Sequence, residues 1–327
     1  MMILPAFKYH QPKTVNEAIA LAQACDGDFD FISGGTDLLP NYKMRLNARG
    51  NVISLSGITE LQDISPTRIG AMARLREVIN TPALQTSLPV IPHTAKLIAT
   101  PLLQESATVG GNIMLDTRCY YFNQSWFWRD SKNYCLKAEG HDCLVVPQQS
   151  VCYATYSGDL APVFMVLGAT FVLVGPDGKR EVPAEKFFTH DGITRNVKLP
   201  EEILTDVIIP ASAQTLRADY LKLRVRDAMD FPVLGVAVAL ELNERTIVRL
   251  RAGLTGVATT PLLFDEVTNG VIGDQLTENL IEVIAEEIMS RVTPYRNVAL
   301  SPQYRKAMIA VYLRRLLQKH LNGEPVS

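Results

Sequence analysis

Four of the five cysteines of this 327-residue chain lie within one short segment and could bind a metal together. They are Cys119, Cys135, Cys143 and Cys152, in the spacing C-x15-C-x7-C-x8-C. Zinc and iron–sulfur clusters both accept thiolate ligands. Because the pattern has no C-x2-C pair, it is neither a ferredoxin pattern nor a zinc ribbon. The spacing alone leaves a cluster and a zinc ion equally open, with free buried thiols as a third alternative.

The segment that contains these cysteines, residues 116–156, differs in composition from the rest of the chain. It holds both tryptophans and nine of the 24 Phe, Trp and Tyr residues. No helix or strand period runs through it. We therefore predict an irregular insertion that folds around a bound group instead of a large apolar core. Cys25 lies far from this segment and is predicted to be a small core residue.

Two pairs of adjacent glycines form a second feature with chemical potential. Gly34-Gly35 follows a short apolar strand at 30–32, and Gly110-Gly111 follows a β-branched run. Paired glycines let a ligand approach the backbone closely, and the N–H groups of such a turn can bind an anion. Two such loops could hold a pyrophosphate between them; the alternative is two tight turns without a ligand. Neither loop matches G-x-G-x-x-G or the P-loop pattern, so neither of those nucleotide sites is expected.

Composition limits the partners and the compartment. With 32 Lys and Arg against 34 Asp and Glu, the formal net charge is −2, which argues against nucleic acid or an anionic membrane as partner. No apolar run reaches the ~18 residues of a membrane span, and the N-terminus has no signal-peptide pattern. We therefore expect a cytoplasmic protein, in which clustered cysteines stay reduced and indicate a metal site.

The elements that must position these residues are predicted from periodicity and caps. A length of 327 residues indicates two or three domains. A helix is expected at 15–24, introduced by Thr14, and helix with a break at Pro101 over 92–103. The other expected strands are 51–55, 68–72, 170–174, 203–210, 233–242 and 246–254, and the other expected helices are 75–79, 160–168, 276–292 and 302–321.

Several motifs, read together, resemble one family. Ile32 to Leu39 followed by Lys43, then Thr108 to Ile113, Asp159 to Pro162, and Lys222 to Ala237 occur in the order seen in the FAD-binding medium subunits of molybdenum hydroxylases, the xanthine oxidase and CO dehydrogenase family. The resemblance covers nearly the whole chain. It implies an α+β protein with a two-part FAD-binding domain of the PCMH or vanillyl-alcohol-oxidase type at 1–213. A CO-dehydrogenase-flavoprotein-like C-terminal α+β domain would follow at 217–323.

The resemblance also implies which residues border a non-covalently bound FAD. Backbone amides in both glycine loops would hold the pyrophosphate, and Asp159 matches an acid near the flavin. Lys222 would stabilise the reduced flavin anion, the alternative being a surface lysine in a strand. The implied FAD-binding residues are Phe31, Ile32, Ser33, Gly34, Gly35, Thr36, Asp37, Leu38, Ile98, Thr100, Thr108, Val109, Gly110, Gly111, Asn112, Asp159, Leu204 and Lys222.

The insertion departs from most of this family. Between Asn112 and Asp159 lie 46 residues, where most members have a handful. A four-cysteine insertion at this place resembles the β subunits of 4-hydroxybenzoyl-CoA reductases, which carry a [4Fe–4S] cluster beside FAD. The resemblance thus implies an iron–sulfur cluster on Cys119, Cys135, Cys143 and Cys152.

The function implied is electron transfer with FAD and a [4Fe–4S] cluster inside a molybdenum enzyme. The implied partners are a large molybdopterin subunit, a small subunit with two [2Fe–2S] clusters, together a dimer of heterotrimers, and a ferredoxin as electron donor. The reaction would be reductive dehydroxylation of 4-hydroxybenzoyl-CoA to benzoyl-CoA on another subunit, so no catalytic residue is assigned here. Two alternatives remain: an ordinary molybdenum hydroxylase FAD subunit with structural zinc, or an assembly protein without redox chemistry.

Overall fold

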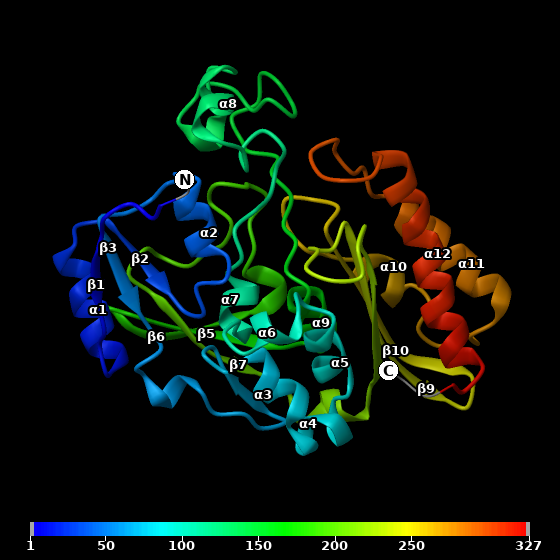
Figure 1. The fold of residues 1–327 in the computed structure, drawn as a ribbon. Coiled ribbons are helices and arrows are strands. Elements are labelled where there is room, and N and C mark those ends of the chain that lie inside the picture. The colour runs from blue at the N-terminus through cyan, green and yellow to red at the C-terminus, as the bar shows by residue number, and fades with distance from the viewer. Residues whose placement is uncertain (1–2, 325–327) are drawn as a thin grey trace.

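Three β-sheets organise residues 3–324, the part of the chain that the structure, a computed structural model, describes. The first two sheets and their helices lie on one side, and the third sheet with its helices lies on the other (Figure 1). A loop-rich segment projects from the top of this body. The architecture is the mixed α+β arrangement that the sequence predicts. No helix within residues 3–324 has the length and apolar character to cross a membrane.

The first sheet is parallel, with strand order β1-β3-β2. The hydroxyl oxygen of Thr14 accepts a hydrogen bond from the Glu17 N–H at 3.1 Å, so the first helix begins where its cap predicts. After the second strand the chain turns through Gly35, whose φ is +69°, and enters a short helix. The elements are β1 (Lys8–His10), α1 (Val15–Ala24), β2 (Phe29–Ile32), α2 (Leu38–Lys43) and β3 (Asn51–Ser54).

The second sheet is antiparallel, with strand order β4-β7-β5-β6, and short helices cover it. The predicted helical segment 92–103 is two helices, because Ala99 has a φ of +53° and Thr100 caps a new helix that starts with Pro101. The elements are η1 (Thr59–Leu61), β4 (Arg68–Gly70), α3 (Leu75–Asn80), α4 (Pro82–Ser87), α5 (Val90–Lys96), α6 (Pro101–Gln104), α7 (Val109–Ile113), α9 (Leu160–Val166), β5 (Thr170–Gly175), β6 (Gly178–Pro183), η3 (Ala184–Lys186) and β7 (Ile203–Ile208).

The prediction of a second glycine turn at Gly110-Gly111 is wrong, because these residues lie inside helix α7. Thr108 caps the helix by accepting a hydrogen bond from the Gly111 N–H at 3.0 Å. A Cβ atom on Gly110 would lie 2.7 Å from the Cβ atom of Ala71. The glycine therefore serves close packing of the helix against the chain after β4, not a turn.

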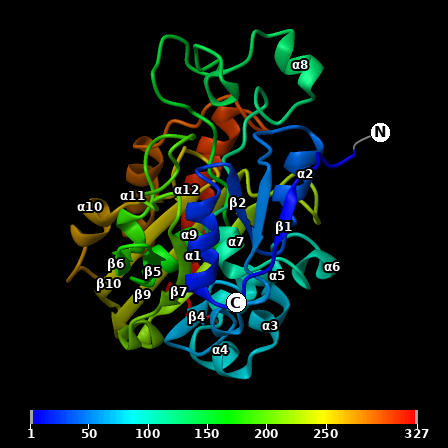
Figure 2. The ribbon, with the colours of Figure 1, turned by 90° about the vertical axis from the view of Figure 1, so that its left-hand side faces the viewer.

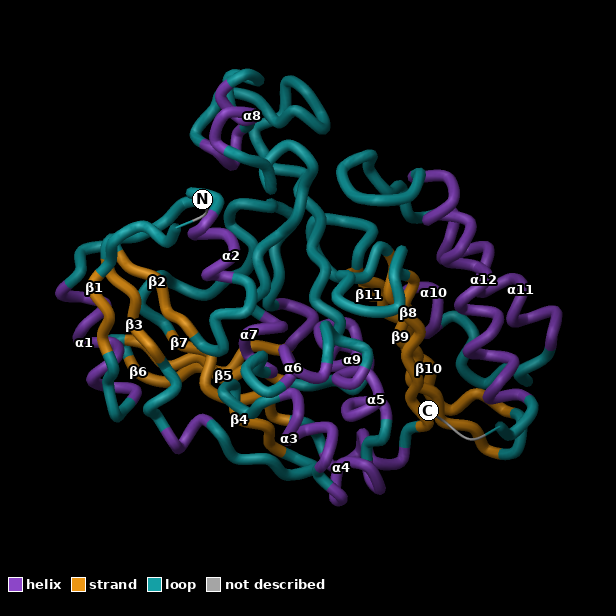
Figure 3. The backbone as a smooth tube through the Cα atoms, viewed as in Figure 1, coloured by secondary structure: helices purple, strands orange, loops and turns teal. Residues whose placement is uncertain are grey.

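The third sheet is antiparallel, with strand order β11-β10-β9-β8, and is covered on both faces. Along β9, Ala237 and Ala239 belong to the core shared with the second sheet, whereas Val236 and Val238 belong to the core under α11 and α12. Figure 3 shows these two long helices beside the strands. The elements are η4 (Ala211–Thr215), β8 (Arg217–Leu223), β9 (Leu234–Asn243), β10 (Thr246–Thr255), β11 (Leu262–Leu263), α10 (Asp265–Asn269), α11 (Glu278–Ser290) and α12 (Pro302–Leu321).

The cysteine-rich segment contains little regular structure and projects from the body in both views (Figures 1 and 2). Its helical turns are α8 (Trp126–Asp130) and η2 (Leu136–Ala138). Where the segment leaves and rejoins the body, Arg118 and Thr155 exchange two backbone hydrogen bonds of 2.7 Å. The buried Arg129 guanidinium donates to the carbonyl of Arg45, just after α2, at 3.0 Å. The segment is therefore attached to the body at defined points.

Candidate flavin and cysteine sites

The two glycine segments predicted to bind the flavin lie side by side. A Cβ atom on Gly34 would overlap the carbonyl oxygen of Ser106, just before α7. A Cβ atom on Gly111 would lie 2.8 Å from the hydroxyl oxygen of Ser33. Glycine at both positions therefore allows the end of β2 to approach the start of α7 closely. Residues 33–37 and 108–112, far apart in sequence, border one place.

The backbone donors of these segments differ. In residues 3–324, no N–H group of residues 33–37 donates a hydrogen bond to the chain. In α7, the N–H groups of Val109 and Gly110 donate to the carbonyls of Ala73 and Ala71, and those of Gly111 and Asn112 donate to Thr108. Free amides suited to an anion therefore come from the first loop.

Asp159 and Lys222, both predicted to border the flavin, form a buried ion pair. The Lys222 ammonium lies 3.1 Å from the carboxylate, and the two side chains are 1% and 2% exposed, respectively. Tyr220 donates its hydroxyl to Asp159 at 2.9 Å. Burial raises the pKa of Asp159, against the opposing effects of Lys222 and Tyr220. The alternative of a surface lysine at 222 is thereby excluded.

The segment containing Ile98 and Thr100 lies next to Lys222. The carbonyl oxygen of Leu97 accepts hydrogen bonds from the Lys222 ammonium at 3.1 Å and from Arg224 at 3.3 Å. Ile98 and Leu204 are buried in the same apolar core, and Thr100 is half-buried at the start of α6. Asp159, Lys222 and the Leu97 carbonyl, which directly precedes Ile98, thus meet where the first part of the chain contacts β8.

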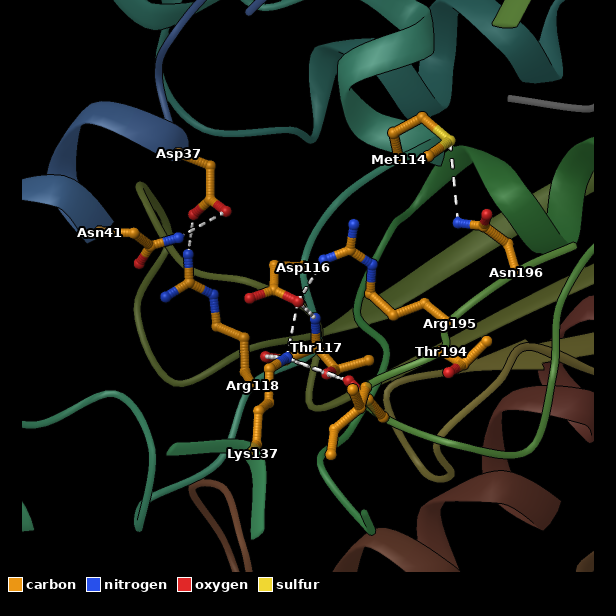
Figure 4. Close-up of polar contacts among 12 residues, drawn as sticks. Asp37, Asn41, Met114, Asp116, Thr117, Arg118, Lys137, Thr194, Arg195 and Asn196 are labelled. Atoms are coloured by element: carbon orange, nitrogen blue, oxygen red, sulfur yellow. Dashed lines mark hydrogen bonds and ion pairs between the residues drawn. The ribbon is translucent and has the colours of Figure 1, made fainter. Parts of the chain in front are cut away.

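A charged network that sequence reasoning missed connects the first glycine loop to the cysteine segment (Figure 4). Asp37, which follows the loop, pairs with Arg118, and Asn41 donates to the same carboxylate at 3.1 Å. The Arg118 guanidinium also lies 4.0 Å from the ring centre of Phe231, a cation–π contact. No local pattern indicates this network, because Asp37 and Arg118 lie 81 positions apart in the sequence.

Asp116 is the second centre of this network. Its carboxylate accepts hydrogen bonds from Lys137 at 2.6 Å and from Arg195 at 2.5 Å. Burial opposes ionisation, but the two cations outweigh it and lower the pKa of Asp116 to about 2. The buried Lys137 ammonium also donates to Thr117 and to the Gly192 carbonyl. These contacts fix the base of the insertion against the segment before β7.

All four predicted metal ligands, Cys119, Cys135, Cys143 and Cys152, line one small pocket. All four are buried. The pocket is otherwise lined by Tyr121, Phe122, Leu136, Lys137, Leu144, Val145 and Ala154. Its surroundings are therefore apolar, with Lys137 as the single cation in the lining. Cys25, predicted to be a core residue, lies elsewhere; it is half-buried and packs against the core of the first sheet.

The thiols surround this space without forming a site for one ion. Within residues 3–324, no group of three or more His, Cys, Asp or Glu side chains is placed to hold a metal ion. A tetrahedral zinc ion with Zn–S bonds of about 2.3 Å needs thiolates about 3.8 Å apart. Burial raises the pKa of Cys119 to about 11 and that of Cys152 to about 12. The thiols of Cys119 and Cys152 are thus neutral at pH 7, and a metal that binds them must displace their protons.

Two family patterns match the chain and together span most of it. Residues 5–212 match the FAD binding domain in molybdopterin dehydrogenase, and residues 219–320 match the CO dehydrogenase flavoprotein C-terminal domain. The chain belongs to the FAD-binding medium subunits of the molybdenum hydroxylase family. It is an oxidoreductase component, and the predicted fold class is confirmed.

Individual relatives agree with this family. The carbon monoxide dehydrogenase medium chain of Hydrogenophaga pseudoflava is 29% identical over 320 residues, 97% of each chain. The aldehyde oxidoreductase FAD-binding subunit of Escherichia coli is 29% identical over 271 residues, 79% of this chain and 83% of that one. The structure of the Hydrogenophaga carbon monoxide dehydrogenase superposes with a TM-score of 0.79 at 27% identity, covering 96% of each chain.

Proposed function

We propose that this medium subunit binds FAD and one [4Fe–4S] cluster and supplies electrons to a molybdenum-containing aryl-CoA reductase. The observation that carries the proposal is the convergence of four buried cysteines on one apolar pocket in the insertion. The preference for a cluster, in which each thiolate binds a different iron, over a zinc ion depends on the resemblance of the four-cysteine insertion.

The residues of the first glycine loop fit the pyrophosphate of FAD. The free N–H groups of residues 33–37 would bind its oxygens, and α7 would close the other side. Asp159 and Lys222 would border the flavin together with Ile98, Thr100 and Leu204. Bound FAD accepts two electrons and returns them one at a time. The Lys222 ammonium, held in place by Asp159, would lie beside the flavin as a fixed positive charge. The surrounding apolar core would exclude water.

The lining of the cysteine pocket fits an iron–sulfur cluster. Cys119, Cys135, Cys143 and Cys152 would be its ligands, and a cluster exchanges single electrons at a potential set by its surroundings. The Tyr121 N–H donates to the Cys119 sulfur at 3.4 Å, which stabilises a thiolate ligand. Lys137 adds a positive charge beside the pocket, while Tyr121, Phe122 and Leu144 keep water away.

The partners and the substrate follow from the family and from the insertion. Relatives are named as medium chains of carbon monoxide, glyceraldehyde and nicotine enzymes, which supports partner subunits carrying molybdopterin and [2Fe–2S] clusters. Those names share no substrate. The assignment to 4-hydroxybenzoyl-CoA and to a ferredoxin donor therefore depends on the resemblance of the four-cysteine insertion. The proposed domains are residues 1–213 and 217–323.

The experiment that tests the proposal measures iron, sulfide, zinc and FAD per chain after anaerobic purification with the partner subunits. We expect one FAD and four irons with four sulfides in excess of the partner clusters, together with a new EPR signal after dithionite. Zinc without extra sulfide would make this an ordinary hydroxylase subunit. Absence of FAD would favour the assembly protein.

One cysteine inside the pocket and one outside it provide matched variants. Cys135→Ser should remove the extra iron and its EPR signal, because the pocket loses one ligand, while FAD remains bound. Cys25→Ser, outside the pocket, should change neither. In the intact complex, reduced ferredoxin should then drive conversion of 4-hydroxybenzoyl-CoA to benzoyl-CoA with C25S and fail with C135S. Equal rates of benzoyl-CoA formation in the two variants would show that the cluster does not supply the electrons.

A further inference from the structure

One residue of the C-terminal domain forms hydrogen bonds with both ends of the cysteine insertion. We call these two ends the neck: the chain leaves the body near Tyr120 and returns near Tyr153. Asn297 lies in the loop between α11 and α12 and is fully buried. Its backbone carbonyl accepts a hydrogen bond from the Tyr120 N–H at 2.8 Å. Its side-chain amide donates to the Tyr153 carbonyl at 2.5 Å, and its side-chain oxygen accepts from the Thr155 hydroxyl at 3.0 Å. Asn297 thus connects the outgoing and returning segments, which are also hydrogen-bonded directly to each other at Arg118 and Thr155.

The bonded residues are sequence neighbours of two pocket cysteines. Cys119 immediately precedes Tyr120, and Cys152 immediately precedes Tyr153. A shift of Asn297 therefore moves the backbone of both cysteines relative to each other. Cys135 and Cys143 lie in the projecting part of the insertion and have no such bond to the C-terminal domain within the described residues.

Contacts with α12 fix the loop that carries Asn297. Arg305 of α12 is completely buried, and its guanidinium donates to the carbonyls of Tyr295 and, at 2.9 Å, Gly256. Tyr295 also packs edge-on against Tyr153, with ring centres 4.9 Å apart. A buried cation held by carbonyl groups makes the loop costly to displace. The loop that carries Asn297 is thus rigid, as it must be if Asn297 is to position other residues.

We propose that Asn297 is a positioning residue for the four-cysteine pocket: it sets the separation of Cys119 and Cys152 from a different domain. The inference depends on the proposed cluster for its full effect, since a cluster needs its four thiolates at fixed separations. Hydrogen-bonded residues around metal ligands fix ligand orientation, and their loss costs about 10- to 100-fold in metal affinity. The C-terminal domain thereby acquires a role at the metal site.

The test compares the transfer of iron to a ferrous chelator from the anaerobic complex of the wild type and of Asn297→Ala. We expect iron loss from this chain at least about tenfold faster in the variant, an altered EPR signal of the reduced cluster, and unchanged FAD content. Asn243→Ala, an exposed asparagine at the end of β9, is the matched control and should behave as the wild type. Equal iron loss and an identical EPR signal in N297A would overturn the inference.

A second pair of variants covers the case in which N297A fails to fold. Thr155→Val removes only the hydroxyl that donates to Asn297, and Thr155→Ser keeps it. T155V should accelerate iron loss and T155S should restore the wild-type rate. In the metal-free chain, alkylation of Cys119 and Cys152 should be faster in T155V than in T155S. If the wild type carries no cluster, the proposed function fails, and equal alkylation of the two variants then overturns the positioning role separately.

Discussion

Lys222 and Asp159 join the two matched regions of the chain through a buried ion pair. Lys222 lies on β8 in the C-terminal region, and Asp159 lies directly before α9 in the FAD-binding region. The ammonium is 3.1 Å from both carboxylate oxygens. Because both groups are removed from water, each charge depends on the other for its stabilisation.

Removing one partner should therefore cost far more than removing both. Lys222→Met leaves a buried carboxylate without a cation, and Asp159→Asn leaves a buried ammonium without an anion. We expect each to lower the free energy of unfolding by about 3–5 kcal/mol. The double variant should lose less than the sum of the two, which urea unfolding would measure as a double-mutant cycle.

A surface pair gives the control for this cycle. Arg76 and Glu105 lie 3.4 Å apart with about half of each side chain exposed. Arg76→Met and Glu105→Gln should each change the free energy of unfolding by less than about 1 kcal/mol. Strictly additive losses at Lys222 and Asp159 would contradict the buried pair.

Gly34→Ala should separate the two flavin segments. The new Cβ atom would overlap the carbonyl oxygen of Ser106. Because this oxygen belongs to the backbone, it cannot rotate away as a flexible side chain could. We expect FAD affinity to fall at least about tenfold, the equivalent of 1.4 kcal/mol, as flavin release titrations would show. Gly270→Ala, where the nearest atom would lie 3.4 Å away, is the matched control. Full FAD affinity in G34A would show that the loop and α7 need not touch.

Arg118→Gln should weaken FAD binding without removing any flavin contact. Asp37 would then be left beside the free amides of residues 33–37 with no counter-charge, and its carboxylate would repel the pyrophosphate. We expect a loss of FAD affinity of about tenfold at low salt, measured by fluorescence titration. Asp37→Asn combined with Arg118→Gln should recover most of it. Without that recovery, Arg118 would act through Phe231 instead.

The elements that the sequence predicts correctly depend on local signals. Helix α12 spans the predicted 302–321, because Ser301 and Pro302 start it and the apolar period continues to its end. Strands β9 and β10 follow from alternating and apolar runs around one turn. Strand β1 has only three residues and pairs with Asn51 to Ile53, so no local pattern indicates it.

The features that the sequence does not predict depend on contacts between distant residues. The helix at Gly110 exists because it packs against Ala71, and Lys222 is buried because Asp159 accepts it. Clustering of the four cysteines in sequence was sufficient to predict that they share one place. Asn297 carries no signal of its own, since it acts on Thr155 from 142 positions away.

His320 provides a prediction that is independent of any cofactor. Its side chain lies at the end of α12, and the residue is 2% exposed. Neither ring nitrogen has a hydrogen-bond partner in residues 3–324. Burial, reinforced by Arg217, lowers the pKa of His320 to about 4. The folded protein therefore prefers the neutral ring, whereas the unfolded chain takes up a proton near pH 6.5.

The sign of the pH effect follows from these two pKa values. The stability that depends on a neutral His320 is complete above pH 6.5 and is lost as the pH falls towards 4. His320→Leu, which has no hydrogen bond to lose, should match the wild type at pH 8. At pH 4.5 it should be more stable than the wild type by about 2–3 kcal/mol in urea unfolding, since one pKa unit corresponds to 1.36 kcal/mol. His190→Leu, at an exposed position, controls for the loss of a histidine. Parallel stability curves for H320L and the wild type would mean that the folded protein accommodates the charged ring, and that the end of α12 opens to water below pH 6.5.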